Sequence, residues 1–175
     1  MGVVVGTALL AGCSDAEGDA DPGGDGSPSG EVSSESSGPT GTAEVPVVPE
    51  LPAEALGDDD AAAVAFVEHW VDLVNYAFES GDAEPASLLG PDCETCHVIA
   101  DGAAEAAAQG DTGRWTLLST AAFDPAGGDE EVADLIVVAT VNVEASDEGA
   151  NGDLTFGLHR QGTGWTIAVL DAAAL

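Results

Sequence analysis

Two of the three cysteines in this chain form a Cys-x-x-Cys-His motif, the pattern of residues with the richest chemistry in the sequence. Cys93, Cys96 and His97 match the motif that attaches haem c, in which two thiols add to the haem vinyl groups and the histidine binds the iron. The same thiols could instead form a structural disulfide or a redox-active dithiol, or join His97 in a zinc site. Four chemistries are therefore open at this motif.

The surroundings of the motif favour a disulfide. Residues i and i+3 in the first turn of a helix lie about 5 Å apart at Cα, which a disulfide can span. The only methionine is Met1, so a haem iron would need His69 or His159 as its second ligand. No predicted strand precedes the motif as in thioredoxin-like sites, and zinc would need a distant fourth ligand. We predict a Cys93–Cys96 disulfide and expect no cofactor or metal.

The third cysteine, Cys13, closes an apolar segment and ends the tetrapeptide Leu10-Ala11-Gly12-Cys13. An aliphatic residue, two small residues and a cysteine form a lipobox: the small residues fit a signal peptidase, and the thiol accepts a diacylglycerol. Residues 1–12 lack the Lys or Arg of an ordinary signal peptide, and we expect the true start to lie upstream of Met1. We predict a lipoprotein signal peptide at 1–12 and lipid on Cys13; an incidental cysteine is the alternative.

The charge of the chain is extreme. Its 175 residues include 33 acidic side chains and two cationic ones, Arg114 and Arg160, for a net charge of −31. Binding of nucleic acid through phosphates needs clustered cations, as does a polybasic membrane patch, so both are excluded. We interpret the acidity as the solvated, self-repelling surface of an exported protein, with cation binding or a salt-rich habitat as the alternative.

Beyond Cys13 the chain divides into a linker and one domain. Residues 13–54 are rich in Gly, Ser, Asp, Glu and Pro and have no aromatic side chain, so we predict a disordered acidic linker that stiffens toward polyproline II over 45–52. Residues 55–175 gain aromatic and periodic apolar residues and suit a single domain. No apolar segment of about 18 residues is present. A lipid would therefore be the membrane anchor.

Helical periodicity dominates the first half of the domain. Apolar residues spaced by three and four predict a helix over 59–80, capped by the Asp run 58–60 and ended by Gly81. A short helix is predicted at 85–89, where Pro85 suits the first turn, and a third over 92–109. The apolar stripe of the first helix consists of Val64, Val67, Val71, Val74 and Phe78, flanked by Phe66 and Trp70.

The second half changes to the alternation that is typical of strands. The predicted strands cover residues 115–120, 132–143, 154–160 and 165–170. Ile136 and Val138 make both faces of the second strand apolar, so this strand should lie inside the sheet. Three helices followed by about four antiparallel strands predict an α+β fold, with the helices on one face of a curved, cone-like sheet.

These elements resemble those of uncharacterised Gram-positive (actinobacterial) lipoproteins. The resemblance is carried by residues 66–77 (FVEHWVDLVNYA), by Gly81-Asp82 and by the segment 91–96 (PDCETC), within a region of roughly 55–175. Such lipoproteins join a lipobox and an acidic linker to a domain of unknown function similar to the nuclear transport factor 2-like cone fold. The resemblance implies a fold and a location, and no reaction.

Cone-shaped folds often enclose an apolar pocket between the long helix and the sheet, and some use a buried Asp or His as a general base. Trp70, Tyr76, His97 and Asp101 are the polar-tipped residues that we expect near such a pocket, with His69 as a further candidate. The sequence has no Gly-x-Ser-x-Gly, phosphate-loop or His-Glu-x-x-His motif.

We therefore predict a non-catalytic protein, anchored by lipid on the extracytoplasmic face of the cell membrane. It would bind a small apolar ligand or an envelope protein. A cone-fold enzyme with an Asp or His base is one alternative. A c-type haem protein that uses Cys93, Cys96 and His97 is the other.

Overall fold

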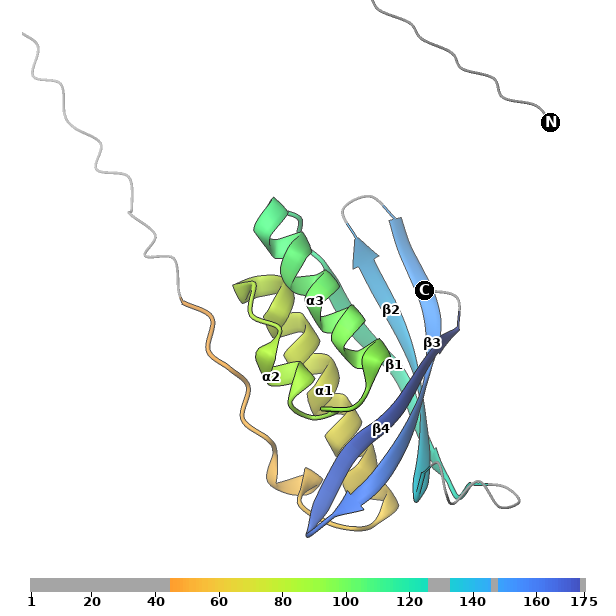
Figure 1. Ribbon diagram of the computed structural model, residues 1–175. Coiled ribbons are helices and arrows are strands. Elements are labelled where there is room, and N and C mark those ends of the chain that lie inside the picture. The colour runs from red at the N-terminus through yellow and green to blue at the C-terminus, as the bar shows by residue number, and fades with distance from the viewer. Residues whose placement is uncertain (1–44, 126–132, 146–147, 174–175) are drawn as a thin grey trace, which may run out of the picture. The chain divides into compact units, whose positions relative to one another are not determined.

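The computed structural model describes residues 45–125, 133–145 and 148–173 of the chain. They belong to one compact unit, residues 42–175. The predicted signal peptide, Cys13 and most of the predicted linker lie outside the described residues. Three α-helices are followed by four antiparallel strands (Figure 1). The predicted α+β class, with helices packed on a four-stranded sheet, is confirmed.

The helices begin and end where the sequence signals indicate. The Asp59 side chain caps the first long helix by accepting a hydrogen bond from the backbone N–H of Ala62 at 2.8 Å. Gly81 and Gly110 end the two long helices in the left-handed conformation, with φ of 76° and 81°. The helical elements are α1 (Asp60–Ser80), α2 (Glu84–Ser87), α3 (Glu94–Gln109) and a 3₁₀ turn, η1 (Ala53–Ala55). No helix in the described ranges has the length and apolar character needed to cross a membrane.

The four strands pair in chain order, and every pairing is antiparallel. The strands are β1 (Arg114–Phe123), β2 (Leu135–Ala145), β3 (Glu148–Gln161) and β4 (Gly164–Ala173). β2 lies inside the sheet, as predicted. β3 begins ahead of the predicted Leu154, because pairing with β2 continues to the Ala145↔Glu148 pair. This pairing extends the strand through Asn151 and Gly152, whose residue types disfavour strands.

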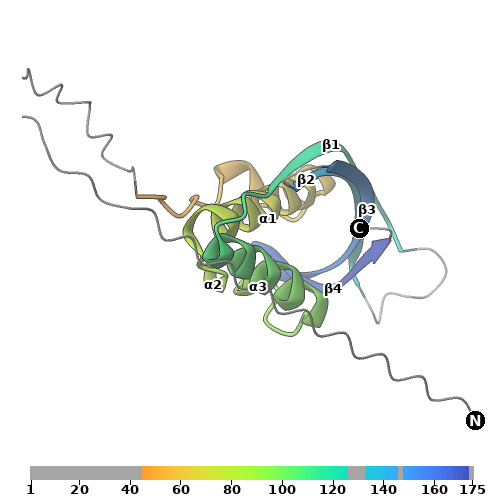
Figure 2. The same cartoon turned by 90° about the horizontal axis from the view of Figure 1, so that it is seen from above.

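The core lies between the helices and the concave face of the sheet, which curves around them when the molecule is seen from above (Figure 2). Trp70 of α1 is fully buried there. Its ring meets those of Trp115 and Phe156 edge-on, at centroid distances of 6.2 and 5.3 Å. The inward side chains of β2 are buried beside them: Leu135, Val137, Ala139 and Val141. These side chains therefore occupy the space between α1 and the middle of the sheet.

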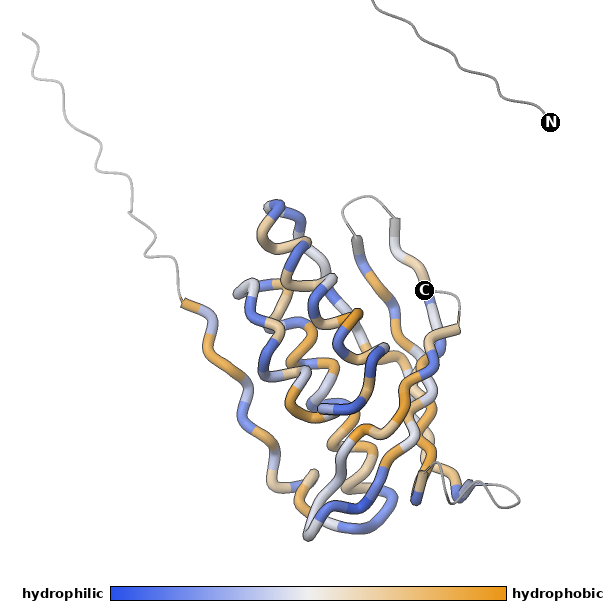
Figure 3. The backbone as a smooth tube through the Cα atoms, in the orientation of Figure 1, coloured by the Kyte–Doolittle hydropathy of each residue, from blue (hydrophilic) through white to orange (hydrophobic). Residues whose placement is uncertain are grey.

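Residues 45–52, here called the proline strap, run in extended form along α1 towards η1 (Figures 1 and 3). Pro46, Pro49 and Pro52 are half-buried, whereas Val45 and Val47 are 80% and 84% exposed. Pro52 has φ −68° and ψ 151°, which are polyproline II values. Because that helix has three residues per turn, prolines spaced by three share one face. The prolines of the strap therefore face the domain.

Candidate functional site

The cysteine motif lies at the start of α3. The Sγ atoms of Cys93 and Cys96 are bonded at 2.01 Å, with the Cα atoms 5.3 Å apart, so the predicted disulfide is present. Cys93 is also the N-cap of the helix, and its Sγ accepts a hydrogen bond from the Cys96 N–H at 3.2 Å. The pair therefore fixes the first turn of α3 to the loop before it.

The surroundings of the disulfide do not suit haem or thiol chemistry. Cys93 and Cys96 are 2% and 0% exposed, and Gly90 packs closely between Cys93 and Ile167 of β4. His97 is paired through Nε2 with the carbonyl oxygen of Pro91 at 3.1 Å. Thiol exchange needs an accessible sulfur, and haem attachment needs open space beside both sulfurs. The residues present therefore do not fit a covalent haem, and the motif serves the fold.

The structure does not bring the four expected pocket residues together. Trp70 lies in the core, and its Nε1 finds no hydrogen-bond acceptor among the described atoms. Tyr76 lies on the outer face of α1, in a hollow beside the proline strap. His97 and Asp101 belong to α3, where Asp101 is exposed. The expected pocket would need the volume that the Trp70 ring fills.

His69 is the buried polar residue of α1, with 5% of its surface exposed. Burial lowers the pKa of its imidazole below the ordinary value of 6.5, and the nearby Asp72 carboxylate opposes this in part. His69 is therefore held in its neutral form. It does not line the described hollows, so no substrate path to it is shown.

Asp134 ties the start of β2 to the end of β3. Its Oδ2 accepts a hydrogen bond from the Arg160 N–H at 2.8 Å and lies 3.3 Å from Nδ1 of His159. The backbone hydrogen bond from Arg160 is the main cause that lowers the pKa of Asp134, followed by the interaction with His159. Arg160 itself lies over the Trp165 ring, 5.0 Å from its centroid. These contacts fix the strand ends.

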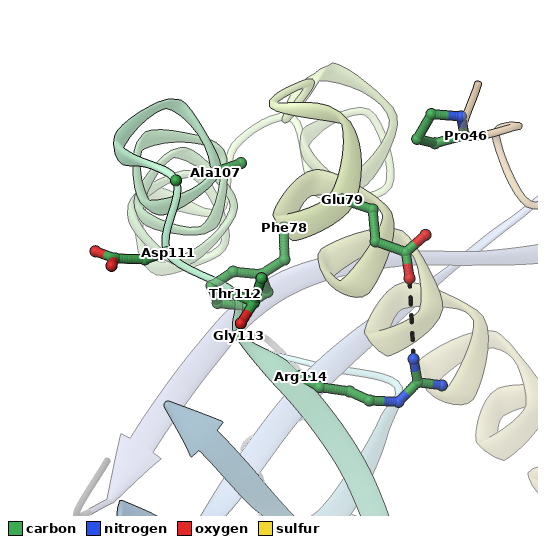
Figure 4. Close-up of a pocket in the computed structure, with 9 residues that line it drawn as sticks. Pro46, Phe78, Glu79, Ala107, Asp111, Thr112, Gly113 and Arg114 are labelled. Carbon is green, nitrogen blue, oxygen red and sulfur yellow. Dashed lines mark ion pairs between the residues drawn. The ribbon is translucent and has the colours of Figure 1, made fainter. Parts of the chain in front are cut away.

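A hollow of about 580 Å³ opens between the C-terminal ends of α1 and α3 and the start of β1 (Figure 4). Glu79 and Arg114 form an ion pair at its edge, with a nitrogen–oxygen distance of 3.9 Å, and both side chains are largely exposed. A smaller hollow of about 180 Å³ shares this pair and has Val47 and Pro49 of the strap in its wall. Within the described ranges no three His, Cys, Asp or Glu side chains converge on a metal position. The described hollows therefore contain no cluster of metal ligands.

The outer face of the sheet carries an apolar row that crosses all four strands. The pairing register aligns Phe123 with Ile136, Ile136 with Gly157 and Gly157 with Val169. Phe123 is 53% and Val169 is 42% exposed. The adjacent row begins with Ala121 and Val138. We call this surface the apolar band: Ala121, Phe123, Ile136, Val138, Gly157 and Val169.

Beside the band, the outer face carries polar side chains that pair with one another. Thr140 Oγ1 donates to Asp153 at 2.8 Å, and Asn142 Nδ2 donates to Asn151 Oδ1 at 2.8 Å. All four side chains take part in cross-strand pairs between β2 and β3. The outer face thus carries these polar pairs of β2 and β3 beside the apolar band, and Leu118, which is 54% exposed, lies next to them at the β1 bulge. The sequence showed only part of this, because the rows appear once the register is known.

The comparisons with known proteins give a family and a fold. Among solved structures, the crystal structure of the intermembrane space region of chloroplast protein ARC6 is similar to this chain, with a TM-score of 0.50 and 19% identity. The match covers 67% of this chain and 98% of that one, and at this identity it shows the fold alone. None of the curated proteins matches the chain.

A model of a protein family of unknown function, DUF6318, matches residues 37–134. The matched region includes the strap, the three helices and β1, and it ends just before β2. It spans more than half of the 175 residues. The chain therefore belongs to the DUF6318 family of unknown function.

Proposed function

We propose that this protein is a lipid-anchored, non-catalytic binding module of the cell envelope, and that its ligand is another protein. One observation carries the choice of ligand: the Trp70 ring, packed against Trp115 and Phe156, fills the space between α1 and the sheet. A small apolar ligand is bound in an enclosed chamber that covers most of its surface. To open such a chamber between α1 and the sheet, the rings of Trp70, Trp115 and Phe156 would have to move apart.

The placement of the titratable groups also favours binding over catalysis. A general base must reach its substrate within hydrogen-bond distance. His69 is 5% exposed and lies apart from the hollows, while the charged pair Glu79 and Arg114 is largely solvated. Neither arrangement resembles the partly buried, mutually oriented groups of an active site. An enzymatic role is therefore the weaker alternative.

The anchor rests on the sequence around Cys13, which follows Leu10-Ala11-Gly12. A lipid on Cys13 would hold the chain at the extracytoplasmic face of the membrane. Residues 14–44, between Cys13 and the proline strap, would span roughly 30 Å as a flexible chain, and their acidic charge would extend it further. The domain would then stand clear of the lipid surface. We also propose that its relatives are actinobacterial lipoproteins with a nuclear transport factor 2-like cone fold.

The anchor is tested by metabolic labelling with a fatty-acid probe in cells that express the full-length gene. The wild type should be labelled and sediment with membranes. Cys13→Ser should lose the label and leave the membrane fraction. The double variant Cys93→Ala/Cys96→Ala is the matched control and should stay labelled. Equal labelling of wild type and Cys13→Ser would contradict the anchor.

The choice of a protein over a small ligand is tested with neutral apolar probes, indole and naphthalene. These should leave the melting temperature of the wild-type chain unchanged. They should raise that of Trp70→Ala, because a large-to-small core change leaves a cavity that apolar molecules occupy. Micromolar binding of either probe to the wild type would favour the small-ligand alternative.

A further inference from the structure

We propose that the apolar band docks a protein partner whose apolar centre is surrounded by Lys and Arg side chains. This inference rests on the proposed function, since it assumes that the ligand is a protein. It adds the surface of the domain that binds and the chemistry of the partner that is bound.

The apolar band is continuous. Single exposed apolar residues are ordinary on protein surfaces, whereas contiguous apolar patches mark binding sites. Here the row from Phe123 through Ile136 to Val169 runs across the full width of the sheet, with a glycine as its third member. Val138 and Ala121 extend it into the neighbouring row. The side chains of the band therefore form one contiguous apolar patch.

The band lies on the side of the sheet that faces away from the helices. All three helices pack on the concave side of the sheet, so the outer side carries none of them (Figure 2). Phe123 and Val169 keep 53% and 42% of their surface exposed at the two ends of the row. A partner that covers the row would remove this apolar surface from water, which is the main driving force of association.

The band differs from the polar side chains on the same face of the sheet. Beyond the band, Thr140 and Asp153 satisfy one another, as do Asn142 and Asn151. These side chains have partners within the sheet and need no other. The band offers no such internal pairing. The band and the polar pairs therefore differ in the way expected for a binding surface beside a solvated one.

The charges decide between the partners that such a band could bind. Asp134 and His159, which lie 3.3 Å apart, are each two positions along the chain from a band residue, Ile136 and Gly157. Asp171 pairs with Thr155 in the row of Val138, and Asp124 follows β1 directly. Arg160 lies over the Trp165 ring and Arg114 contacts Glu79, so neither cation of the chain joins this rim. The rim of the band is acidic.

A second copy of the chain would bring the same charge of −31 and the same acidic rim. Like charges across an interface oppose docking, whereas opposite charges speed encounter and fix orientation. An anionic lipid surface is repelled for the same reason. A protein with cations around an apolar centre satisfies both the band and its rim.

The test is a selection of random displayed peptides on the full-length chain at 50 mM NaCl. Enriched peptides should carry Lys or Arg beside aromatic or aliphatic residues. Their affinity for Phe123→Ser/Val169→Thr, which changes two exposed positions and keeps strand-compatible residues, should fall at least about tenfold. The control Thr140→Ser/Asn151→Ser, in the polar pairs of the same face, should change it by less than about twofold. Raising NaCl to 500 mM should weaken binding, because the cations of the peptide are screened.

Four results would overturn the proposal. Peptides that bind both double variants equally would move the site elsewhere and leave the proposed function standing. Enriched peptides without cations would remove the charge argument. Concentration-dependent dimers in sedimentation, lost in Phe123→Ser/Val169→Thr, would make a second copy the occupant. A selection that enriches no peptide at all would count against the proposed function as well.

Discussion

Gly90 lies where the chain between α2 and α3 passes over β4, and the absence of a side chain there lets the two segments meet. A Cβ atom at Gly90 would lie 3.0 Å from the Cβ atoms of Cys93 and Ile167 and 3.1 Å from the Ile167 carbonyl oxygen. Beside it, the Leu89 carbonyl accepts hydrogen bonds from the Ile167 N–H at 2.9 Å and the Thr166 hydroxyl at 3.1 Å. Leu89, through its carbonyl, and Gly90, through its close approach, thus join the loop before the disulfide to β4 at the edge of the sheet.

Gly90→Ala should lower the free energy of unfolding by about 1–3 kcal/mol, because the methyl group meets backbone and Cβ atoms that must move. Gly102→Ala is the matched control. Gly102 is exposed in the middle of α3 with no atom within 4 Å of its Cβ position. It should gain about 0.5–1 kcal/mol from the better helix propensity of Ala. Urea unfolding followed by tryptophan fluorescence measures both changes in the free energy of unfolding. A gain in stability for Gly90→Ala like that for Gly102→Ala would contradict the close packing of Gly90 against Cys93 and Ile167.

His69 should make stability depend on pH. Its pKa is lowered by burial, so the unfolded chain takes up the proton first as pH falls below about 6.5. The stability that the neutral imidazole contributes is complete above that pH and is lost on acidification. The stability advantage of the wild type over His69→Gln should therefore shrink between pH 8 and pH 5. A pH-independent difference in urea midpoint would show that His69 titrates normally.

At the scale of elements, Asn75 joins α1 to the start of β1. Its Nδ2 donates to the Trp115 carbonyl oxygen at 2.9 Å, and its Oδ1 accepts from the Trp115 N–H at 2.7 Å. The side-chain amide thus takes the place that a neighbouring strand would fill beside Trp115. Two backbone groups at the free edge of β1 are satisfied in this way. The bridge holds Trp115 where its ring meets Trp70.

Asn75→Ala should lower the free energy of unfolding by about 2–4 kcal/mol, because each backbone group left without a partner costs about 1–3 kcal/mol. Asn75→Asp should restore little, since its carboxylate would face the Trp115 carbonyl oxygen. Ser80→Ala, which removes two exposed hydrogen bonds, one to the Tyr76 carbonyl oxygen and one from the Asp82 N–H, should cost less than about 1 kcal/mol. Chemical unfolding compares the three variants. Similar losses in the free energy of unfolding for Asn75→Ala and Ser80→Ala would show that the Asn75 bridge stabilises the fold no more than exposed hydrogen bonds do.

The sequence predicts these elements well where local signals dominate. Asp59 and Gly81 predict the two ends of α1 correctly, because helix capping depends on neighbouring residues alone. The start of β3 was misplaced because Asn151 and Gly152 are strand residues only through pairing with β2. The bridge of Asn75 to Trp115 joins residues forty positions apart, and no local pattern indicates it.

The candidate site was less predictable than the fold. The disulfide followed from the spacing of Cys93 and Cys96, which a helix turn fixes. The expected pocket did not assemble because Trp70 and Tyr76 lie on different faces of α1: Trp70 is buried in the core, whereas Tyr76 lines an outer hollow. The apolar band needed the strand register, although the alternation of Ile136 and Val138 already hinted at an apolar outer face.

At the scale of the whole molecule, the net charge of −31 opposes compactness. Within the described ranges Glu79 and Arg114 form an ion pair, and Asp134 Oδ2 lies 3.3 Å from His159 Nδ1; both contacts lie partly or largely in solvent. Exposed pairs contribute little to stability. The fold therefore persists against a general repulsion that its own contacts do not neutralise.

Salt should stabilise this protein. Raising NaCl from 0.1 to 1 M shortens the screening length from about 10 to about 3 Å, which weakens repulsion among surface carboxylates. The urea midpoint at pH 7 should rise with NaCl and with KCl alike. Near the pI of about 4.1, where many carboxylates are protonated, the rise should be much smaller. A midpoint independent of salt at pH 7 would contradict a repulsion-limited fold.

The proline strap has a mechanical consequence. Any pull on the chain ahead of Val45 reaches the folded unit through the strap, whose three prolines lie along α1 and whose far end leads into the buried Ala55. Because the strap runs towards the N-terminal end of the helix, such a force can peel the prolines away one after another. Each proline that separates from α1 lengthens the extended chain ahead of the folded unit. The strap would therefore detach under force before the core around Trp70 is disrupted.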